Sequence, residues 1–238
     1  MDQNYLNTLA GLSAAERIAH LLSGGIPCTD VLVLAHGNIA ELKAHLEENQ
    51  ITYELITGEE LLACTLDGGR IERNGLCYGA IAVPFAPVMP RAWRERLDDL
   101  SYGGVLVFFS DTEPWVDDEE SPIYDGMGPA ITADLCDLAG MIRMFDCAHF
   151  APSRKYKALR FCHVTREGCD VYLFINTSSY TVGFTFEGEP DLAIYLPEEN
   201  KLYRPECKNR RTRIKIKGGS LLLAVTADDL EALPRLRY

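Results

Sequence analysis

The sequence lacks the features that mark membrane-spanning and secreted proteins. Its 238 residues contain no apolar run of about 18 residues, so no membrane-spanning helix is expected. The first residues, 1–4, show neither the basic stretch nor the apolar core of a signal peptide. We therefore expect either a cytoplasmic protein or a chain cut from a longer one, and we expect no membrane partner.

Positive charge is scarce relative to negative charge. The chain has 23 Lys and Arg residues against 35 Asp and Glu residues, which gives a formal net charge of −12. Such a surface repels phosphate backbones and anionic headgroups, so nucleic acids are not expected as partners. Apolar residues make up 47 % of the chain, enough for a sizeable core in one or two domains.

The eight cysteines lack the spacing of metal and redox motifs. No pair forms Cys-x-x-Cys, and no cysteine stands at zinc-finger spacing from a histidine. Because they are scattered through apolar segments, we interpret them as reduced, buried thiols, with a disulfide framework as the alternative. The sequence predicts no metal site.

Motifs for cofactor binding and covalent catalysis are also missing. The segment 35–38 follows an apolar run but holds one glycine, unlike the glycine-rich loops that bind dinucleotides and phosphates. The segment 86–90, after another apolar run, offers no serine or cysteine nucleophile. We therefore expect no cofactor and assign no catalytic residue.

Two patterns of hydrophobicity divide the chain near residue 150. Before that point, short apolar runs alternate with helical patterns; after it, segments with a period of two residues dominate. We predict one domain over residues 1–150 and a second over 151–238, with a linker at 151–155.

The first part predicts an α/β flavodoxin-like domain. Strands alternating with helices require a parallel sheet with right-handed crossovers, here of four to five strands. The strands are expected at 31–35, 53–56, 78–85 and 105–109. The helices are expected at 13–23, 38–48, 57–64, 90–100 and 131–142.

The second part predicts a small antiparallel all-β sandwich. Its apolar residues alternate with polar ones, and turn sequences separate the runs. The strands are expected at 159–165, 171–176, 182–186, 192–196, 201–203, 212–217 and 221–225.

A ligand crevice is expected at the carboxyl edge of the parallel sheet, where open α/β sheets bind their ligands. Asp111 is interpreted as a cap of the segment that follows it. Trp115 is interpreted first as packing over the core, with contact to a sugar or a partner domain as the alternative. An acidic run at 117–120 predicts a solvated loop. The residues placed at this crevice are His36, Asn38, Glu59, Asp111 and Trp115.

Several segments together resemble a known domain arrangement. The segments 31–35, 51–62 and 69–85 look like the glutamine-amidotransferase-like domain of large bacterial glycoside hydrolases, which is similar to the β-galactosidase trimerisation domain. The segments 160–163 and 170–178 look like the β-sandwich that follows it in such proteins. The resemblance implies that the hydrolytic carboxylates belong to a separate barrel domain, for which 238 residues leave no room.

Three functions remain open at this point. The resemblance implies a non-catalytic accessory region of a multidomain glycoside hydrolase, which packs against its other domains or forms oligomers. A carbohydrate-binding module is the alternative, and a free-standing enzyme would need His36, Glu59 and Asp111 to share one pocket. The binding module would need coplanar aromatic side chains, drawn from Tyr172, Tyr180, Tyr195 and Tyr203.

Overall fold

The chain folds into two compact units. The computed structural model describes residues 1, 3–116, 129–150, 152, 155–187, 192–208, 211–227 and 230–236. The acidic run at 117–120 and most of the expected linker lie outside the described residues.

The boundary between the units differs from the predicted one. The α/β unit comprises Thr29–Glu47 and Ile51–His149, and the β unit comprises Met1–Cys28, Glu48–Gln50 and Phe150–Tyr238. The prediction placed residues 1–28 in the α/β domain, whereas they pack within the β unit. The two short helices in this segment bury their apolar faces within the β unit, and the order of the segments along the sequence does not reveal this packing.

The α/β unit is built on a five-stranded sheet in which every pairing is parallel. Numbered along the chain, its strands lie in the order 2-1-3-4-5. All residues of β2 and β7 are buried, as expected for strands covered on both faces. Across the sheet the strands are β3 (Tyr53–Ile56), β2 (Val31–Leu34), β7 (Ala80–Val83), β9 (Leu106–Ser110) and β11 (Ile131–Ala133).

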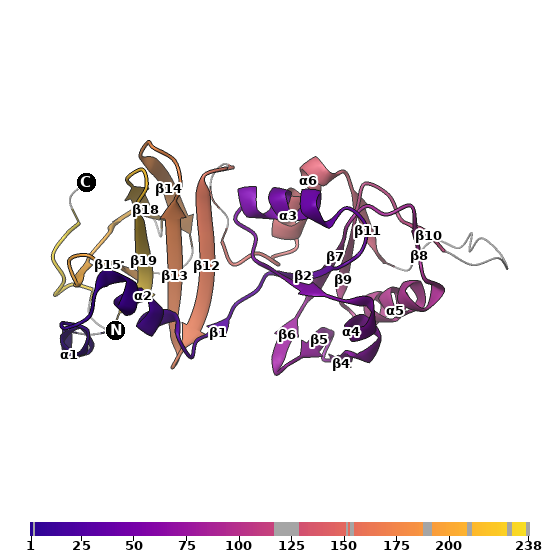
Figure 1. Cartoon of the computed structure of the whole chain (residues 1–238), viewed down its shortest axis with the longest axis horizontal. Coiled ribbons are helices and arrows are strands. Elements are labelled where there is room, and N and C mark those ends of the chain that lie inside the picture. The colour runs from indigo at the N-terminus through magenta and orange to yellow at the C-terminus, as the bar shows by residue number, and fades with distance from the viewer. Residues whose placement is uncertain are drawn as a thin grey trace. The chain divides into compact units, whose positions relative to one another are not determined.

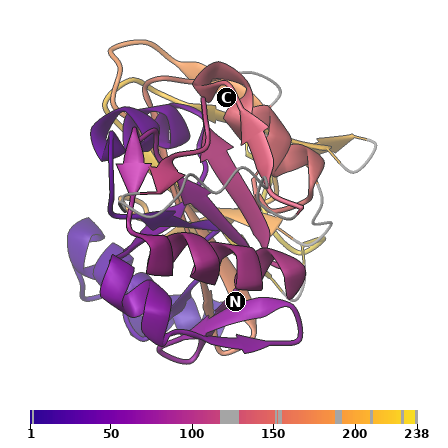
Figure 2. The same cartoon turned by 90° about the vertical axis from the view of Figure 1, so that its right-hand side faces the viewer.

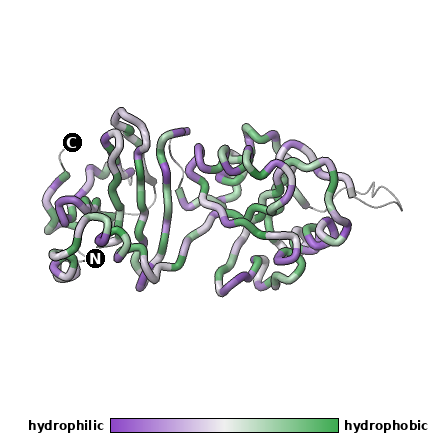
Figure 3. Tube along the Cα trace, viewed as in Figure 1, coloured by the Kyte–Doolittle hydropathy of each residue, from purple (hydrophilic) through white to green (hydrophobic). Residues whose placement is uncertain are grey.

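Helices cover both faces of this sheet (Figure 1). On one face, α3 (Ile39–Glu48) and α6 (Leu135–Met144) bury leucines against β2, β7 and β9. On the other, α4 (Gly58–Ala63) and α5 (Arg91–Tyr102) do the same, and Figure 2 shows the magenta α5 lying lengthwise across the view. The hydrophobic segments accordingly concentrate on the central strands in Figure 3.

The segment 131–142 is not the single helix predicted from its pattern. Residues 131–133 form β11, which pairs in parallel with β9, and α6 begins only after Asp134. Ile131 and Thr132 are β-branched and favour extended backbone, and the edge of β9 supplies their hydrogen-bond partners. The helical pattern is real but starts one turn later than expected.

Two smaller β sheets flank the parallel sheet. One is a three-stranded antiparallel sheet of β4 (Thr65–Asp67), β5 (Arg70–Arg73) and β6 (Leu76–Tyr78). Beyond the carboxyl ends of the large sheet, β8 (Val88–Met89) pairs in parallel with β10 (Trp115–Val116).

The β unit contains two antiparallel sheets, and its predicted strands are confirmed with small shifts of their ends. The larger sheet has the order β1 (Ile26–Pro27), β12 (Leu159–Arg166), β13 (Cys169–Asn176), β19 (Leu221–Thr226), β15 (Leu192–Leu196), β16 (Lys201–Tyr203). The smaller has the order β14 (Val182–Glu187), β18 (Arg211–Ile216), β17 (Glu206–Lys208).

The larger sheet of the β unit has apolar cover on both faces. One core joins it to the smaller sheet through side chains such as Phe174 and Phe184. On its other face, α1 (Gln3–Thr8) and α2 (Ala14–Leu22) bury Leu6 and Leu21 against it. A capping box begins α2, since Ser13 and Glu16 each accept from the other's backbone N–H.

None of the eight cysteines, which all lie in the described part of the chain, forms a disulfide bond, but the expectation that they are buried is wrong. Cys77, Cys136, Cys162 and Cys207 are exposed, and the other four are partly exposed. Cys64 and Cys147 pack against the two cores of the α/β unit without being fully buried. Within the described residues, no helix combines the length and apolar character that a bilayer crossing requires.

Candidate functional site

His36 lies at the carboxyl end of β2 and is held by its neighbours. Its Nε2 atom lies 2.7 Å from the carbonyl oxygen of Val88 in β8. Its ring meets that of Trp93 edge-on, with 5.3 Å between the ring centroids. Both contacts fix the orientation of the imidazole, so His36 serves as a structural part of the carboxyl edge of the sheet.

Two glycines let the surrounding segments approach closely at this edge. Gly37 has φ of +69°, and a Cβ atom there would lie 2.2 Å from the carbonyl oxygen of Phe85. The Asn38 N–H donates to that same oxygen at 2.8 Å, so the loops after β2 and β7 touch. A Cβ atom on Gly58 would lie 1.9 Å from the Trp93 ring. The indole therefore occupies the space beside the start of α4.

The polar residues predicted for the crevice serve local structure. The Asn38 side-chain amide donates to Glu41, and Glu59 is exposed in the first turn of α4. Asp111, with φ of +67°, accepts from the N–H of Leu135 at 3.0 Å through Oδ1. Asp111 thus satisfies an N–H at the start of α6, 24 residues further along the chain, rather than capping the segment that directly follows it.

The same edge exposes large apolar side chains. Phe85 and Val88 are each 43 % exposed, and Trp115 is 63 % exposed. Val88 and Trp115 are direct partners in the β8–β10 pair. We call these three residues the carboxyl-edge patch. The prediction that Trp115 packs over the core is wrong, and an exposed apolar group of this kind is typical of a binding surface.

Glu60, which follows the predicted site residue Glu59, is held by hydrogen bonds and an ion pair. Its carboxylate closes a capping box with Thr57 and accepts from Arg73 at 2.5 Å. Arg73 also pairs with Glu54, which accepts from the hydroxyl of Tyr78. Burial, together with the Glu54 carboxylate, raises the pKa of Tyr78. The network ties β5 and β6 to β3 and α4.

The pKa of Glu60 gives a pH-dependent prediction. The Thr57 backbone N–H and Arg73 lower it from 4.5 to about 2. This stabilisation is complete above pH 4.5, because the unfolded chain is also ionised there, and is lost as the pH falls towards 2. Both tryptophans, Trp93 and Trp115, lie in the α/β unit, so urea unfolding followed by tryptophan fluorescence reports on this unit. We expect Glu60→Gln to remove part of the acid destabilisation, whereas an unchanged pH profile would contradict this role.

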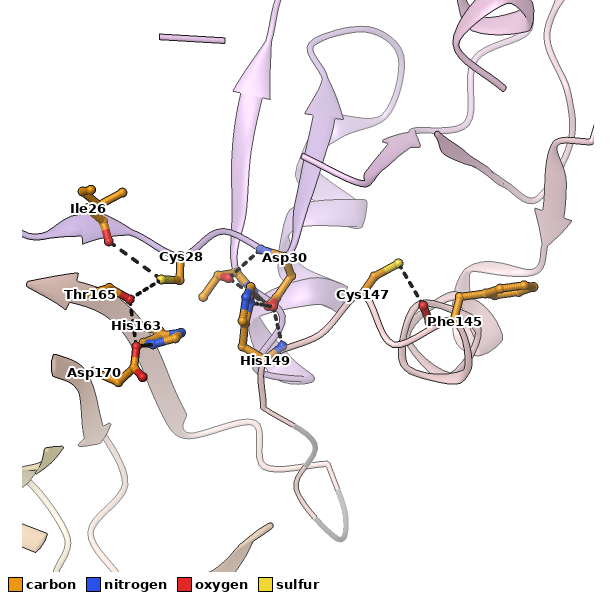
Figure 4. A network of polar contacts seen from close by, with 10 residues as sticks. Ile26, Cys28, Asp30, Phe145, Cys147, His149, His163, Thr165 and Asp170 are labelled. Atoms are coloured by element: carbon orange, nitrogen blue, oxygen red, sulfur yellow. Dashed lines mark hydrogen bonds and ion pairs between the residues drawn. The ribbon is translucent and has the colours of Figure 1, made fainter. Parts of the chain in front are cut away.

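A hollow of about 550 Å³ lies at the opposite, amino end of the parallel sheet. Two short segments, 29–30 and 145–149, contribute to its wall. Asp30 and His149 stand next to each other there, with 2.6 Å between Asp30 Oδ1 and His149 Nδ1 (Figure 4). The histidine side chain is 43 % exposed and the carboxylate is fully buried.

Asp30 acts as a structural acceptor at this end. Its carboxylate accepts from the backbone N–H groups of Thr52 and His149, each at 2.6 Å. It also accepts from the Thr52 hydroxyl at 2.8 Å. These bonds join the start of β2 to the start of β3 and to the segment after α6. Ligand sites of open α/β sheets lie at the other end, so we interpret the Asp30–His149 pair as structural.

Tyr172, Tyr180, Tyr195 and Tyr203, the four tyrosines named for a carbohydrate-binding face, do not form one. Tyr172 and Tyr195 are buried, in cores on opposite faces of the larger sheet. Tyr180 is 64 % exposed and Tyr203 is partly exposed. A cleft of about 740 Å³ is lined by Tyr203 together with charged and apolar residues, among them Glu199.

Metal-ligating side chains gather in two places among the described residues. Asp134, Cys136 and Asp137 are all exposed and lie within four consecutive positions of the chain. The other group, Cys28, His163 and Asp170, comes from three separate strands or strand ends of the β unit. Spacing along the sequence could not reveal it, because strand pairing brings residue 28 beside residue 163.

Comparisons with known proteins bear on the fold. No family model matches the sequence, and a search of curated proteins gives no match. Among solved structures, the rhamnosidase from Novosphingobium sp. PP1Y matches 94 % of this chain and 25 % of its own, with 15 % identity and a TM-score of 0.67. The β-galactosidase from Bacillus circulans sp. alkalophilus matches 90 % of this chain and 44 % of its own, with 9 % identity and a TM-score of 0.57.

The structure of a third enzyme also matches this chain over part of its own length. The α-L-fucosidase isoenzyme 2 from Paenibacillus thiaminolyticus matches 90 % of this chain and 51 % of its own, with 8 % identity and a TM-score of 0.54. The chain thus spans from a quarter to about half of the length of these structures. The chain therefore shares its fold with segments of several glycoside hydrolases.

Proposed function

We propose that the chain is a non-catalytic accessory region of a multidomain glycoside hydrolase, which supports domain packing or oligomerisation. The observation that carries the proposal is the match of 94 % of this chain to 25 % of a rhamnosidase structure. A fold that recurs in structures of a rhamnosidase, a β-galactosidase and an α-L-fucosidase fits a role that does not depend on the sugar. The partners are then the other domains of the parent protein or a second copy of the chain.

The architecture supports the finer assignment to a flavodoxin-like, amidotransferase-like module. The strand order 2-1-3-4-5 is that of the flavodoxin-like sheets. In enzymes with such sheets, chemistry takes place at the carboxyl edge. Here His36 contacts Val88 and Trp93, and Asp111 holds the start of α6. Two of the three groups that a free-standing enzyme would need are thus engaged in structure, and the third, Glu59, is exposed in the first turn of α4.

The carboxyl-edge patch supports the assembly role. Its members, Phe85, Val88 and Trp115, expose apolar surface at the edge where related folds bind ligands. Burial of such side chains provides the largest share of the free energy of association, and tryptophan is enriched among the residues that dominate interfaces. This surface thus fits contact with another protein domain better than contact with solvent.

A substitution in this patch gives a test in solution. We expect Trp115→Ser to weaken self-association at least about tenfold, because one buried tryptophan contributes more than about 1.4 kcal/mol to an interface. Sedimentation equilibrium over a concentration series measures the association constant. Tyr102→Ser is the matched control, since Tyr102 is 74 % exposed in the same unit. Equal effects of both substitutions would contradict a role of the patch in oligomerisation.

Carbohydrate binding is the second candidate, and the cleft of about 740 Å³ in the β unit favours it. Tyr203 offers an aromatic surface there, and Glu199 and Lys215 offer polar groups that sugars could engage. Isothermal titration calorimetry with galactose, rhamnose and fucose tests this candidate. Heat that saturates with wild type and is lost with Tyr203→Ala would favour it over assembly.

A further inference from the structure

Three side chains with metal-binding atoms converge in the β unit (Figure 4). Cys28 follows β1, His163 lies in β12, and Asp170 lies near the start of β13. One ligand atom of each, the Cys28 Sγ, a ring nitrogen of His163 and a carboxylate oxygen of Asp170, lies within 4.8 Å of the other two. We propose that these residues bind one divalent transition-metal ion, and that the ion is Zn²⁺.

The backbone holds the three residues in register. The N–H of Cys28 donates to the carbonyl of His163 at 3.0 Å, which continues the β1–β12 pairing by one residue. On the other side of β12, Thr165 is the direct partner of Asp170. The Asp170 N–H is in turn fixed by the Thr226 hydroxyl at 3.1 Å. Three neighbouring strand positions thus present their side chains to one place.

The histidine is preorganised within this group. His163 is only 5 % exposed, and its ring stacks on that of Tyr172 with 4.1 Å between centroids and 17° between planes. Its Nε2 lies 2.9 Å from Asp170 Oδ1. The stacking holds the plane of the ring, and the contact with the carboxylate directs this nitrogen at Asp170. Cys28 and Asp170 are partly exposed, which leaves an approach for an ion.

The donor set matches the chemistry of zinc. Zinc binds thiolate sulfur at about 2.3 Å, imidazole nitrogen at about 2.0 Å and carboxylate oxygen at about 2.1 Å, in tetrahedral geometry. Those bond lengths place neighbouring donor atoms about 3–4 Å apart. Donor atoms within 4.8 Å of one another reach that arrangement by side-chain movements of about 1 Å. A fourth position remains for water.

Thr165 supplies the outer hydrogen bonds that such sites use. Its Oγ1 atom donates to Asp170 Oδ1 at 2.8 Å and lies 3.1 Å from the Sγ atom of Cys28. In metal sites, groups that hydrogen-bond to the ligands orient them and raise their affinity. Without an ion, the same atoms satisfy one another. Metal binding would exchange the direct contact between His163 and Asp170 for two bonds to the ion.

Cobalt absorption tests the site on the full chain under reducing conditions. Co²⁺ takes tetrahedral sites similar to those of Zn²⁺, and a cysteine thiolate bound to it gives an intense ultraviolet charge-transfer band. We expect this band to saturate at one equivalent of Co²⁺ and to disappear when Zn²⁺ is added. Cys28→Ser should abolish it, and Asp170→Asn should weaken Co²⁺ binding at least about tenfold.

Cys207→Ser is the matched control, since Cys207 is an exposed cysteine of the same unit and should leave the band unchanged. Wild type should also unfold at a higher temperature with Zn²⁺, and Cys28→Ser should not. Absence of a saturable band would overturn the proposal. So would a band that survives Cys28→Ser. Far-ultraviolet circular dichroism establishes that the serine variant is folded, which is expected because Cys28 is partly exposed.

Discussion

Replacement of Asp30 by alanine is expected to lower the free energy of unfolding of the α/β unit by about 3–5 kcal/mol. The carboxylate is fully buried and accepts from two backbone N–H groups, from the Thr52 hydroxyl and from the His149 ring. Alanine would leave these donors without their acceptor in a place that water reaches poorly. Urea unfolding followed by the fluorescence of Trp93 and Trp115 measures the loss.

Asp99→Ala is the control for this experiment. Asp99 is exposed on α5, so its removal should change the free energy of unfolding by no more than about 0.5 kcal/mol. A change below about 1 kcal/mol for Asp30→Ala would show that the amino ends of β2 and β3 do not depend on this carboxylate.

Replacement of Phe174 by alanine is expected to cost the β unit a similar amount, about 3–5 kcal/mol. Phe174 is completely buried, and its ring lies 5.0–5.3 Å from those of Phe150, Phe161 and Phe184. Alanine would remove the ring and leave a cavity between the two sheets. Hydrogen exchange of the amides in β12, β13 and β19 measures the change in this unit.

A smaller substitution at the same position separates volume from specific ring contacts. Phe174→Leu keeps an apolar side chain in the core and should cost about half as much as alanine or less. Equal costs for leucine and alanine would indicate that the packing of the aromatic rings, rather than filled volume, stabilises this core.

The fold could be predicted from the sequence where the burial of side chains produces a simple pattern of apolar residues. The run at 31–34 is apolar at every position because helices cover both faces of β2. In β18, exposed Arg213 alternates with buried Ile214, the pattern of a strand with one covered face. Ser13 and Pro90 mark the starts of α2 and α5, and each stands directly before the first helical residue.

Other features depend on contacts between distant residues and leave no local pattern. Leu6 and Leu21 could cover either part of the chain, and only the folded structure shows that they pack on the larger β sheet. Ile131 and Thr132 join a strand because the edge of β9 is available. Cys28 and His163 are 135 positions apart in sequence yet adjacent in the β1–β12 ladder. No spacing rule could predict that pairing.

Most of the predicted site residues were selected by a rule about sheets, which places residues at the carboxyl edge but does not give the role of each side chain. Asp111 and Asn38 follow strands, as the rule requires, yet both engage neighbouring backbone or side chains. The feature with the clearest functional character is the exposure of Phe85, Val88 and Trp115. Whether a residue is exposed depends on which other side chains pack over it, and a local sequence pattern does not reveal this packing.

Initial rates of nitrophenol release from aryl galactosides, rhamnosides and fucosides by the purified chain test the non-catalytic role most directly. The proposal predicts rates equal to those of the buffer blank at every pH and enzyme concentration. Turnover that scales with the concentration of the chain and falls in Glu59→Gln or Asp111→Asn would contradict it, and would place a catalytic site at the carboxyl edge of the sheet.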